Sequence, residues 1–210
     1  ATFKLAPVAR VIGILMILTG ISTACVVQID AGQIGVKTLF GKVQDDVLYS
    51  GLNVVNPLVD VIKLDSKTQN YTMSGVHDEG EQAGDDAIRV LTRDGLEVII
   101  DLTALYRILP TEAPTLLRET GRDYKDKVIR PITRTKIRDN AVYFDAVELY
   151  STKRDTFQIL IFNSIEADLK HRGIVLEQLM VRNIDLPASV KASIESKINA
   201  EQEAQKMQFV

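Results

Sequence analysis

The chain has 210 residues, of which 46% are hydrophobic and 25% are charged, and its formal net charge at pH 7 is −3. Charges of both signs are interspersed, and a balance so close to neutral argues against binding to nucleic acid. The single cysteine, Cys25, excludes an intrachain disulfide and a metal site built from cysteines alone.

The first marked feature along the chain is an apolar run from Val11 to Ile29, which carries no charge and lies between Arg10 and Asp30. As a helix rising ~1.5 Å per residue, this run approaches the ~30 Å hydrocarbon thickness of a bilayer. A helix is also the form in which one isolated segment satisfies its own backbone groups in lipid. We therefore predict a transmembrane helix within residues 1–29. The residues expected to anchor it are Val11, Ile14, Leu15, Ile17, Leu18, Ile21, Val26 and Val27.

Two kinds of cleaved segment also begin with an apolar run. A secretory signal has a shorter apolar centre and a cut site of small residues, which Ser22-Thr23-Ala24 could provide. A lipoprotein signal would make Cys25 the lipidated residue, but Ser22 stands where such signals usually carry leucine. The sequence thus favours an uncleaved N-terminal anchor.

The orientation of this anchor follows only weakly from the flanking charges. Lys4 and Arg10 precede it, and Lys37 and Lys42 follow it closely, so the positive charges nearly balance. The short N-terminal segment favours an N-terminus in the cytoplasm. The main domain would then lie on the opposite side, which is the periplasmic side for a bacterial inner membrane.

Residues 30–74 contain several short stretches typical of strands, separated by turn residues. We predict a small antiparallel β-module beside the membrane, with strands at residues 33–40, 43–49, 52–55, 58–64 and 67–73. One apolar stretch in it permits two interpretations, a core strand with a proline at its edge or a loop lying in the lipid headgroup layer. The stretch runs from Leu52 to Val59, and the candidate contact residues in it are Val54, Val55, Leu58 and Val59.

The next segment, residues 75–87, is polar, acidic and typical of an exposed loop. A metal site would draw on His77, Asp78, Glu79, Asp85 and Asp86. Their spacing matches no ligand motif, and runs of charge are usually solvated loops, so we expect no bound metal.

Residues 75–186 combine a long hairpin with helices. Arg93-Asp94-Gly95 supplies a hairpin turn, and the strand after it has an apolar face at a period of two that requires a helix layer. We expect a short helix at 110–117, a basic helix from Asp123 that breaks at Pro131, and a helix over 152–171 capped by Ser151. The basic helix suits a solvated face or a subunit contact better than a phosphate site. A last strand at 174–186 completes an α+β domain.

Pro187 opens a final helix over residues 187–210, which contains no helix breaker. Its apolar stripe is thin, as in long helices that pack on a parallel neighbour. We predict that the helix continues beyond Val210 as a coiled coil. The residues expected to make contacts between subunits are Val190, Ile194, Ile198 and Met207.

Several motifs, in order along almost the whole chain, resemble those of the prohibitins of the SPFH (band 7) superfamily. They are Asp30-Ala31-Gly32-x-x-Gly35-Val36, Thr92-Arg93-Asp94-Gly95-Leu96, Tyr106-Arg107, Asp123-Tyr124, Val128-Ile129-x-Pro131, Ile137-Arg138, Phe144-x-Ala146-x-Glu148-Leu149, Arg154 and Ala200-Glu201-Gln202-Glu203-Ala204 with Phe209-Val210. The low aromatic content suits a bacterial or cyanobacterial homologue.

This resemblance implies that residues 30–74 and 75–186 are the two parts of an SPFH domain. It also implies a non-enzymatic scaffold in which identical subunits form a ring or cage on membrane lipids. Such scaffolds define a membrane microdomain and commonly enclose or regulate an FtsH-type AAA protease. A stomatin-like regulator of a membrane protease or channel is the alternative.

An enzyme would need a nucleophile with a base, or a cluster of metal ligands. The chain has only two histidines, His77 in the acidic loop and His171 at a predicted helix end, where it complements the helix dipole. No GxSxG, P-loop or HExxH motif occurs. We therefore expect no catalytic site, no metal and no cofactor.

Overall fold

The computed structural model describes residues 12–16, 19–20, 25–76, 80 and 84–208. The chain divides into two compact units, which we describe separately. The first unit comprises residues 1–67 and 108–122, and the second comprises residues 68–107 and 123–210.

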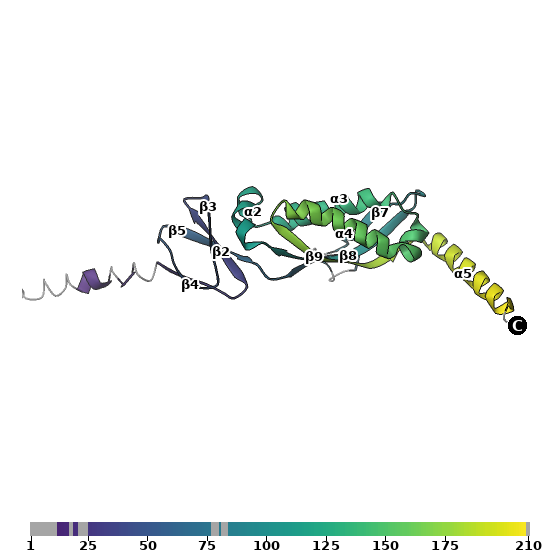
Figure 1. Cartoon of the computed structure of the whole chain (residues 1–210), viewed down its shortest axis with the longest axis horizontal. Coiled ribbons are helices and arrows are strands. Elements are labelled where there is room, and N and C mark those ends of the chain that lie inside the picture. The colour runs from purple at the N-terminus through teal and green to yellow at the C-terminus, as the bar shows by residue number, and fades with distance from the viewer. Residues whose placement is uncertain (1–11, 17–18, 21–24, 77–79, 81–83, 209–210) are drawn as a thin grey trace, which may run out of the picture. The chain divides into compact units, whose positions relative to one another are not determined.

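The first unit is built from two small antiparallel sheets and a helix (Figure 1). In one sheet, β1 (Val26–Ile29) pairs with β4 (Gly51–Val54); we call this pair the β1–β4 ribbon. The other sheet has the order β3-β2-β5, formed by β2 (Gln33–Leu39), β3 (Lys42–Leu48) and β5 (Val59–Asp65). A short 3-10 helix, η2 (Pro110–Glu112), leads into α2 (Ala113–Glu119), which packs against β3.

The predicted helix over Val11–Ile29 is wrong at its C-terminal end. Residues 12–16 and 19–20 are helical, but Val26–Ile29 is strand β1. β-branched residues suit a strand, and the backbone of β1 finds its partners in β4 while Ile29 enters the core at 2% exposure. Within the part of the chain that the structure describes, no helix has the length and apolar character needed to cross a bilayer.

The second unit places a helix layer on one sheet. β8 (Glu97–Ile108) pairs with β6 (Gln69–Met73), β7 (Ile88–Leu91) and β9 (Ile174–Asp185). Figure 1 shows α3 (Arg130–Ala141) and α4 (Arg154–Lys170) side by side over this sheet. α4 buries Phe157, Ile161, Ile165 and Leu169 along one side. The predicted α+β domain with a helix layer is therefore confirmed.

Three sequence predictions for this unit need correction. The strand predicted at 67–73 was expected in the membrane-proximal module, but it is β6 and pairs with β8. This pairing places Tyr71 and Met73 in the core, where both are fully buried. Ser151 does not cap α4; it lies in the π-helical segment η4 (Glu148–Thr152), where its hydroxyl donates to the Val147 carbonyl, 2.8 Å away. At Pro131 the predicted break is not an interruption: the π-helical segment η3 (Lys125–Ile129) passes directly into α3 at Arg130, so the helix changes type and continues.

The loop before β7 is attached to α3 through a buried carboxylate. Asp86 is 3% exposed, and its side chain accepts hydrogen bonds from Arg130 and Arg134. Its backbone N–H donates to the Ser74 carbonyl at 3.0 Å, which closes the base of the loop. Two of the carboxylates considered for a metal are thus paired with arginines, because Asp85 pairs with Arg89.

Gly35 marks the contact between the two sheets of the first unit. A Cβ atom there would lie 2.8 Å from Val61 and 2.9 Å from the Ile29 side chain. We expect Gly35→Ala to destabilise the protein by roughly 1–3 kcal/mol, because overpacking forces both side chains to move. Denaturant unfolding in detergent measures this. Gly13→Ala, whose new methyl group meets nothing within 4 Å, is the control and should cost nothing; equal stability of the two variants would contradict the packing argument.

Tyr71 predicts a loss of stability at alkaline pH. Burial, followed by the negative charge of Asp126, raises the pKa of Tyr71 to about 12. In the unfolded chain the Tyr71 hydroxyl loses its proton near the ordinary pKa of about 10. The contribution of the buried, protonated Tyr71 to stability is therefore complete below pH 10 and is lost as the pH rises through about 12. Between pH 10 and pH 12 the free energy of unfolding of the wild type should fall by on the order of 2 kcal/mol more than that of Tyr71→Phe. Unfolding curves against pH test this, with Tyr49→Phe, an exposed residue, expected to follow the wild type.

Candidate functional site

The β1–β4 ribbon has one buried face and one exposed apolar face. Val26 lies opposite Val54, and Leu52 lies opposite Gln28. Residues directly opposite in an antiparallel pair point to the same side, so these four side chains share a face. Val26 is 47% exposed, Leu52 77% and Val54 83%. We call Val26, Leu52 and Val54 the apolar face; the other face carries Ile29 into the core.

The turn after β4 adds one more exposed apolar side chain. The Val59 N–H donates to the Asn56 carbonyl at 2.9 Å, and the Leu58 N–H donates to the Asn56 side chain at 3.0 Å. Pro57 fits such a turn because its φ is already fixed. The side chain of Leu58, at the tip, is 61% exposed.

The two interpretations of the stretch from Leu52 to Val59 each apply to part of it. Val54 and Leu58 are exposed, as a loop against lipid requires. Val55 is 8% exposed, and its N–H donates to the Cys25 carbonyl at 2.7 Å, so its assignment to an exposed loop is wrong. Val59 is half-buried at the start of β5. Which residues of the stretch are exposed and which are buried follows from strand pairing, because alternate side chains along a strand point to opposite faces.

Sequence reasoning missed Phe40, and it included Leu52 in the apolar stretch without naming it among the candidate contact residues. Both are among the most exposed large apolar residues of the first unit. Phe40 is 84% exposed at the tip of the β2–β3 hairpin. A signal was present, because Phe40-Gly41 interrupts two strand patterns at a place where turns usually carry polar residues.

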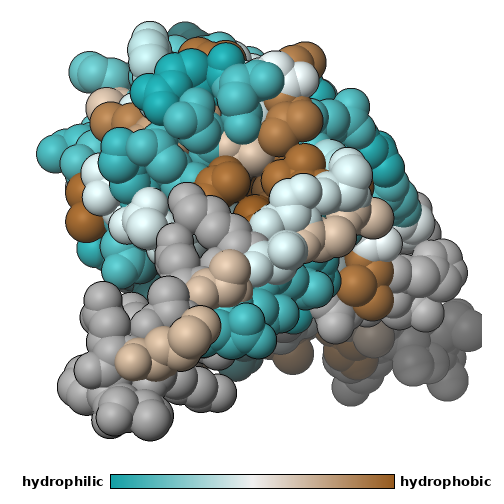
Figure 2. All heavy atoms as spheres, turned by 90° about the vertical axis from the view of Figure 1, so that its right-hand side faces the viewer, coloured by the Kyte–Doolittle hydropathy of each residue, from teal (hydrophilic) through white to brown (hydrophobic). Residues whose placement is uncertain are grey.

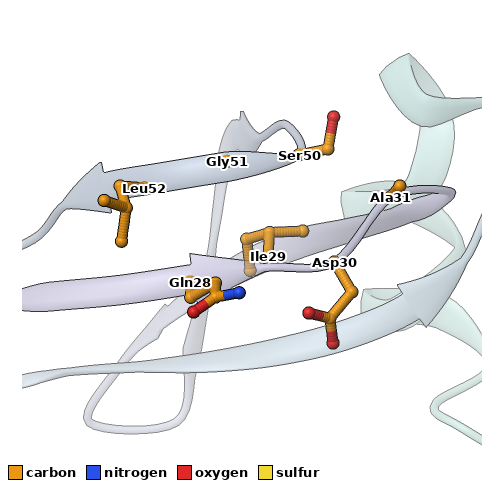
Figure 3. A pocket seen from close by; sticks show the side chains of 7 residues that line it. All are labelled: Gln28, Ile29, Asp30, Ala31, Ser50, Gly51 and Leu52. Atoms are coloured by element: carbon orange, nitrogen blue, oxygen red, sulfur yellow. The ribbon is translucent and has the colours of Figure 1, made fainter.

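An open hollow lies at the other end of the ribbon, next to the tight turn between β1 and β2. It holds about 500 Å³ and is bounded by Gln28, Asp30, Ser50 and Leu52 (Figure 3). No pair of opposed titratable groups converges there, because Asp30 is the only ionisable residue of its lining. The hollow therefore has the chemistry of a surface depression rather than of a catalytic site.

The predicted anchor residues are only partly described. Ile14 and Leu15 are 58% and 62% exposed in the helical stretch 12–16. Val26 and Val27 lie in β1, where Val27 is half-buried. The remaining anchor residues lie outside the described part of the chain: Val11, Ile17, Leu18 and Ile21.

The last helix, α5 (Ala188–Gln208), exposes its stripe. Val190 and Ile194 are half-buried, Met207 is 76% exposed, and the side chain of Ile198 lies outside the described set. No side chain of α5 that the structure describes is buried. Figure 2 shows hydrophilic and hydrophobic residues interspersed on the face of the molecule that carries the C-terminal end.

Two of the sequence motifs meet in the second unit. The Arg93 N–H donates to the Phe144 carbonyl at 2.9 Å, and the Arg93 guanidinium pairs with Asp145. Asp94 accepts a hydrogen bond from the Ala146 N–H at 3.2 Å. The hydrogen bond from Arg93 lowers the pKa of Asp145 below its ordinary value. The hairpin tip is thereby held against the segment between α3 and η4.

Other motif residues also connect elements. The ring of Tyr106 meets that of Tyr124 edge-on at 6.4 Å, and both hydroxyls donate to the Gln69 side chain. Arg154, at the start of α4, donates to the Val181 carbonyl of β9 at 2.7 Å. These residues fix the sheet and the helix layer relative to each other.

The residues that could perform chemistry are dispersed. Among the described residues, no group of three or more His, Cys, Asp or Glu side chains could hold a metal ion. His171 follows α4 and is exposed, and His77 lies outside the described residues. The side chains that the structure does bring together make hydrogen bonds and ion pairs within the fold.

Comparison with known families agrees with this architecture. A model of the SPFH domain / Band 7 family matches residues 27–210. The chain belongs to the SPFH/Band 7 family. The match begins within β1 and runs through α5, so it includes all of the β1–β4 ribbon except Val26.

The relatives of this SPFH protein are prohibitins, which confirms the resemblance drawn from the motifs. Prohibitin-2 of Xenopus tropicalis is 29% identical over 119 residues, covering 57% of the chain and 39% of that protein. Prohibitin 1 of Drosophila melanogaster is 28% identical over 119 residues, with 57% and 43% covered. Prohibitin 1 of Gallus gallus is 25% identical over 206 residues, with 93% and 68% covered. The chain thus spans less than half the length of the first two.

Proposed function

We propose that this SPFH protein is a membrane-anchored scaffold without enzymatic activity, whose identical subunits assemble into a large ring or cage. The observation that carries the proposal is the exposed apolar face of the β1–β4 ribbon, which follows directly after the apolar run of residues 11–25. Leu52 and Val54 are largely exposed, and transfer of such apolar side chains from water to a lipid surface is favourable.

The apolar face follows the proposed membrane anchor directly in the sequence. Val26 is the first residue of the apolar face and of β1, so no linker separates the apolar run from the folded unit. Burial of each large aliphatic side chain contributes about 1.5–3 kcal/mol when complete. Val54 and Leu58 would therefore add to the membrane affinity of the anchor. An assembly of many copies would bind the membrane more tightly than one subunit does, because many anchors and apolar faces act together.

The exposed stripe of α5 supports self-association. Val190, Ile194, Ile198 and Met207 repeat at the spacing of a helix that packs on a neighbouring helix, and those of them that the structure describes are not buried. Identical subunits are the simplest partners for such a stripe. Head-to-tail contacts between identical subunits close into a ring when the rotation permits.

A ring of this kind would enclose a membrane microdomain, and its partner could be an FtsH-type membrane AAA protease. The alternative is a stomatin-like regulator of a membrane protease or channel, which works without a closed cage. Particle mass separates the two functions: a scaffold forms megadalton-scale particles in detergent, whereas a monodisperse monomer would exclude the ring. The bacterial source and the periplasmic position of the main domain stay predictions.

Replacing both Ile14 and Leu18 with Arg tests the anchor. Each arginine at the centre of a membrane span costs about 2.5–3.5 kcal/mol, so the double variant should leave the membrane fraction. Carbonate extraction followed by sedimentation measures the released share. The control exchanges Ile14→Leu and Leu18→Ile, which keeps the run apolar and should keep the protein bound. Full retention of the arginine variant would mean that the run is not the principal anchor.

Replacing both Ile194 and Ile198 with Asp tests the helix contacts. Burial of two carboxylates between helices is strongly unfavourable, so the particles should shrink to small oligomers on a sizing column. The matched control places the same charges at the same spacing on exposed positions, Ala192→Asp with Ser196→Asp, and should leave the particle size unchanged. If the first variant keeps the wild-type size, α5 does not hold the subunits together.

A further inference from the structure

The turn between β2 and β3 has an unusual residue at its first position. Leu39 pairs with Lys42, so Phe40 and Gly41 form a two-residue hairpin turn. Their φ angles are 48° and 82°. Such turns favour Asn-Gly or Asp-Gly, because both positions require the left-handed region. Phe40 is the only residue other than glycine with a positive φ among those that the structure describes.

Among the described residues of the first unit, no core packing of the Phe40 side chain compensates for this backbone conformation. The Phe40 side chain is 84% exposed, so it does not contribute to the core in return for the strain. Contact of the ring with an apolar surface outside the fold would offset the cost of the strained backbone. The position therefore points to an external contact.

Strand pairing places this turn next to other exposed apolar residues. Leu39 is paired with Val59, the residue that follows Leu58 in the turn after β4. That turn continues from Val54, which is opposite Val26, where the apolar run enters the fold. The hairpin tip is therefore next to the turn after β4, which carries the exposed Leu58.

Lys42 completes the local chemistry. It directly follows the turn, is exposed, and forms no ion pair among the described residues. A lysine beside an aromatic residue suits the boundary of a bilayer, since its stem can lie along apolar groups while the ammonium group stays among the polar headgroups. An aromatic ring is itself favoured at this boundary.

We propose that the Phe40-Gly41 turn is a second lipid contact, in which the Phe40 ring enters the interfacial layer of the bilayer independently of the N-terminal run. The inference rests on the proposed membrane function and adds a named residue and a named surface to it. The lipid bilayer is the occupant, because Leu58, which precedes the Val59 that pairs with Leu39, is a second exposed apolar residue beside the turn, and Lys42 suits the headgroup layer.

The chain contains no tryptophan, so a single substitution creates a specific fluorescent probe. Phe40→Trp in the full chain, reconstituted into phosphatidylcholine vesicles, should emit at shorter wavelength than in the unfolded protein. Vesicles carrying brominated acyl chains should quench most of its emission. Tyr49→Trp is the matched control, because Tyr49 is 58% exposed and follows β3 at the opposite end of the hairpin. Brominated lipids should leave the emission of this control nearly unchanged.

The outcomes separate this inference from the proposed function. If the protein sediments with vesicles but the Phe40→Trp probe is not quenched, the lipid contact is wrong and the membrane scaffold stands. An unquenched probe with short-wavelength emission in both detergent and vesicles would mean that another protein surface covers Phe40, which also overturns the inference. If no variant reaches the vesicles, both proposals fail.

Phe40→Asn provides an independent measurement. It creates Asn-Gly, the preferred pair for this turn, so the variant should unfold at a higher temperature than the wild type in detergent. In the Ile14→Arg, Leu18→Arg background, the same change should lower the remaining vesicle binding by roughly tenfold, as expected for losing one interfacial aromatic ring. A variant that is less stable, or that binds vesicles as well as its parent, would contradict the role of Phe40.

Discussion

The contact between Ile29 and Gly35 organises the first unit. Ile29 is 2% exposed, and the absence of a side chain on Gly35 lets the β1–β4 ribbon approach β2 closely. The end of the apolar run is thereby incorporated into the folded unit as a strand. Because β1 has one face on the core, its opposite face and that of β4 must point outward. The residues found there are Val26, Leu52 and Val54, together with the polar Gln28. The exposure of an apolar surface beside the anchor follows from this one packing contact.

The second unit is held together by polar contacts at a few places. Arg93 and Asp94 attach the hairpin tip to the segment after α3, and Asp86 attaches the preceding loop to α3 through two arginines. Breaking a buried pair of this kind by removing one partner leaves an uncompensated charge, which is strongly destabilising. These polar contacts fix the shape of the unit, which is what repeated lateral contacts in an assembly require.

The two ends of the described chain differ in what they leave uncovered. The first unit exposes individual large side chains at the ribbon and at the Phe40 turn, which suits a contact with a fluid apolar surface. α5 exposes a periodic stripe, which suits a rigid partner of matching periodicity. An SPFH protein with both features is suited to contact lipid at one surface and copies of itself at another. Each surface can be removed separately by substitution, so the two contacts can be tested separately.

The sequence by itself determined much of this architecture. Period-two patterns identified the strands, Asp94-Gly95 the hairpin turn, and the ordered motifs the SPFH family, because these signals depend on local sequence. The tertiary structure alone decided the rest. Val26–Ile29 is a strand since β4 offers its backbone partners, Val55 is inside since it pairs with Cys25, and β6 joins β8 since only that sheet buries Tyr71. The sequence marked Phe40-Gly41 as an unusual turn, but only the tertiary structure established that the Phe40 side chain is exposed, because exposure depends on its surroundings.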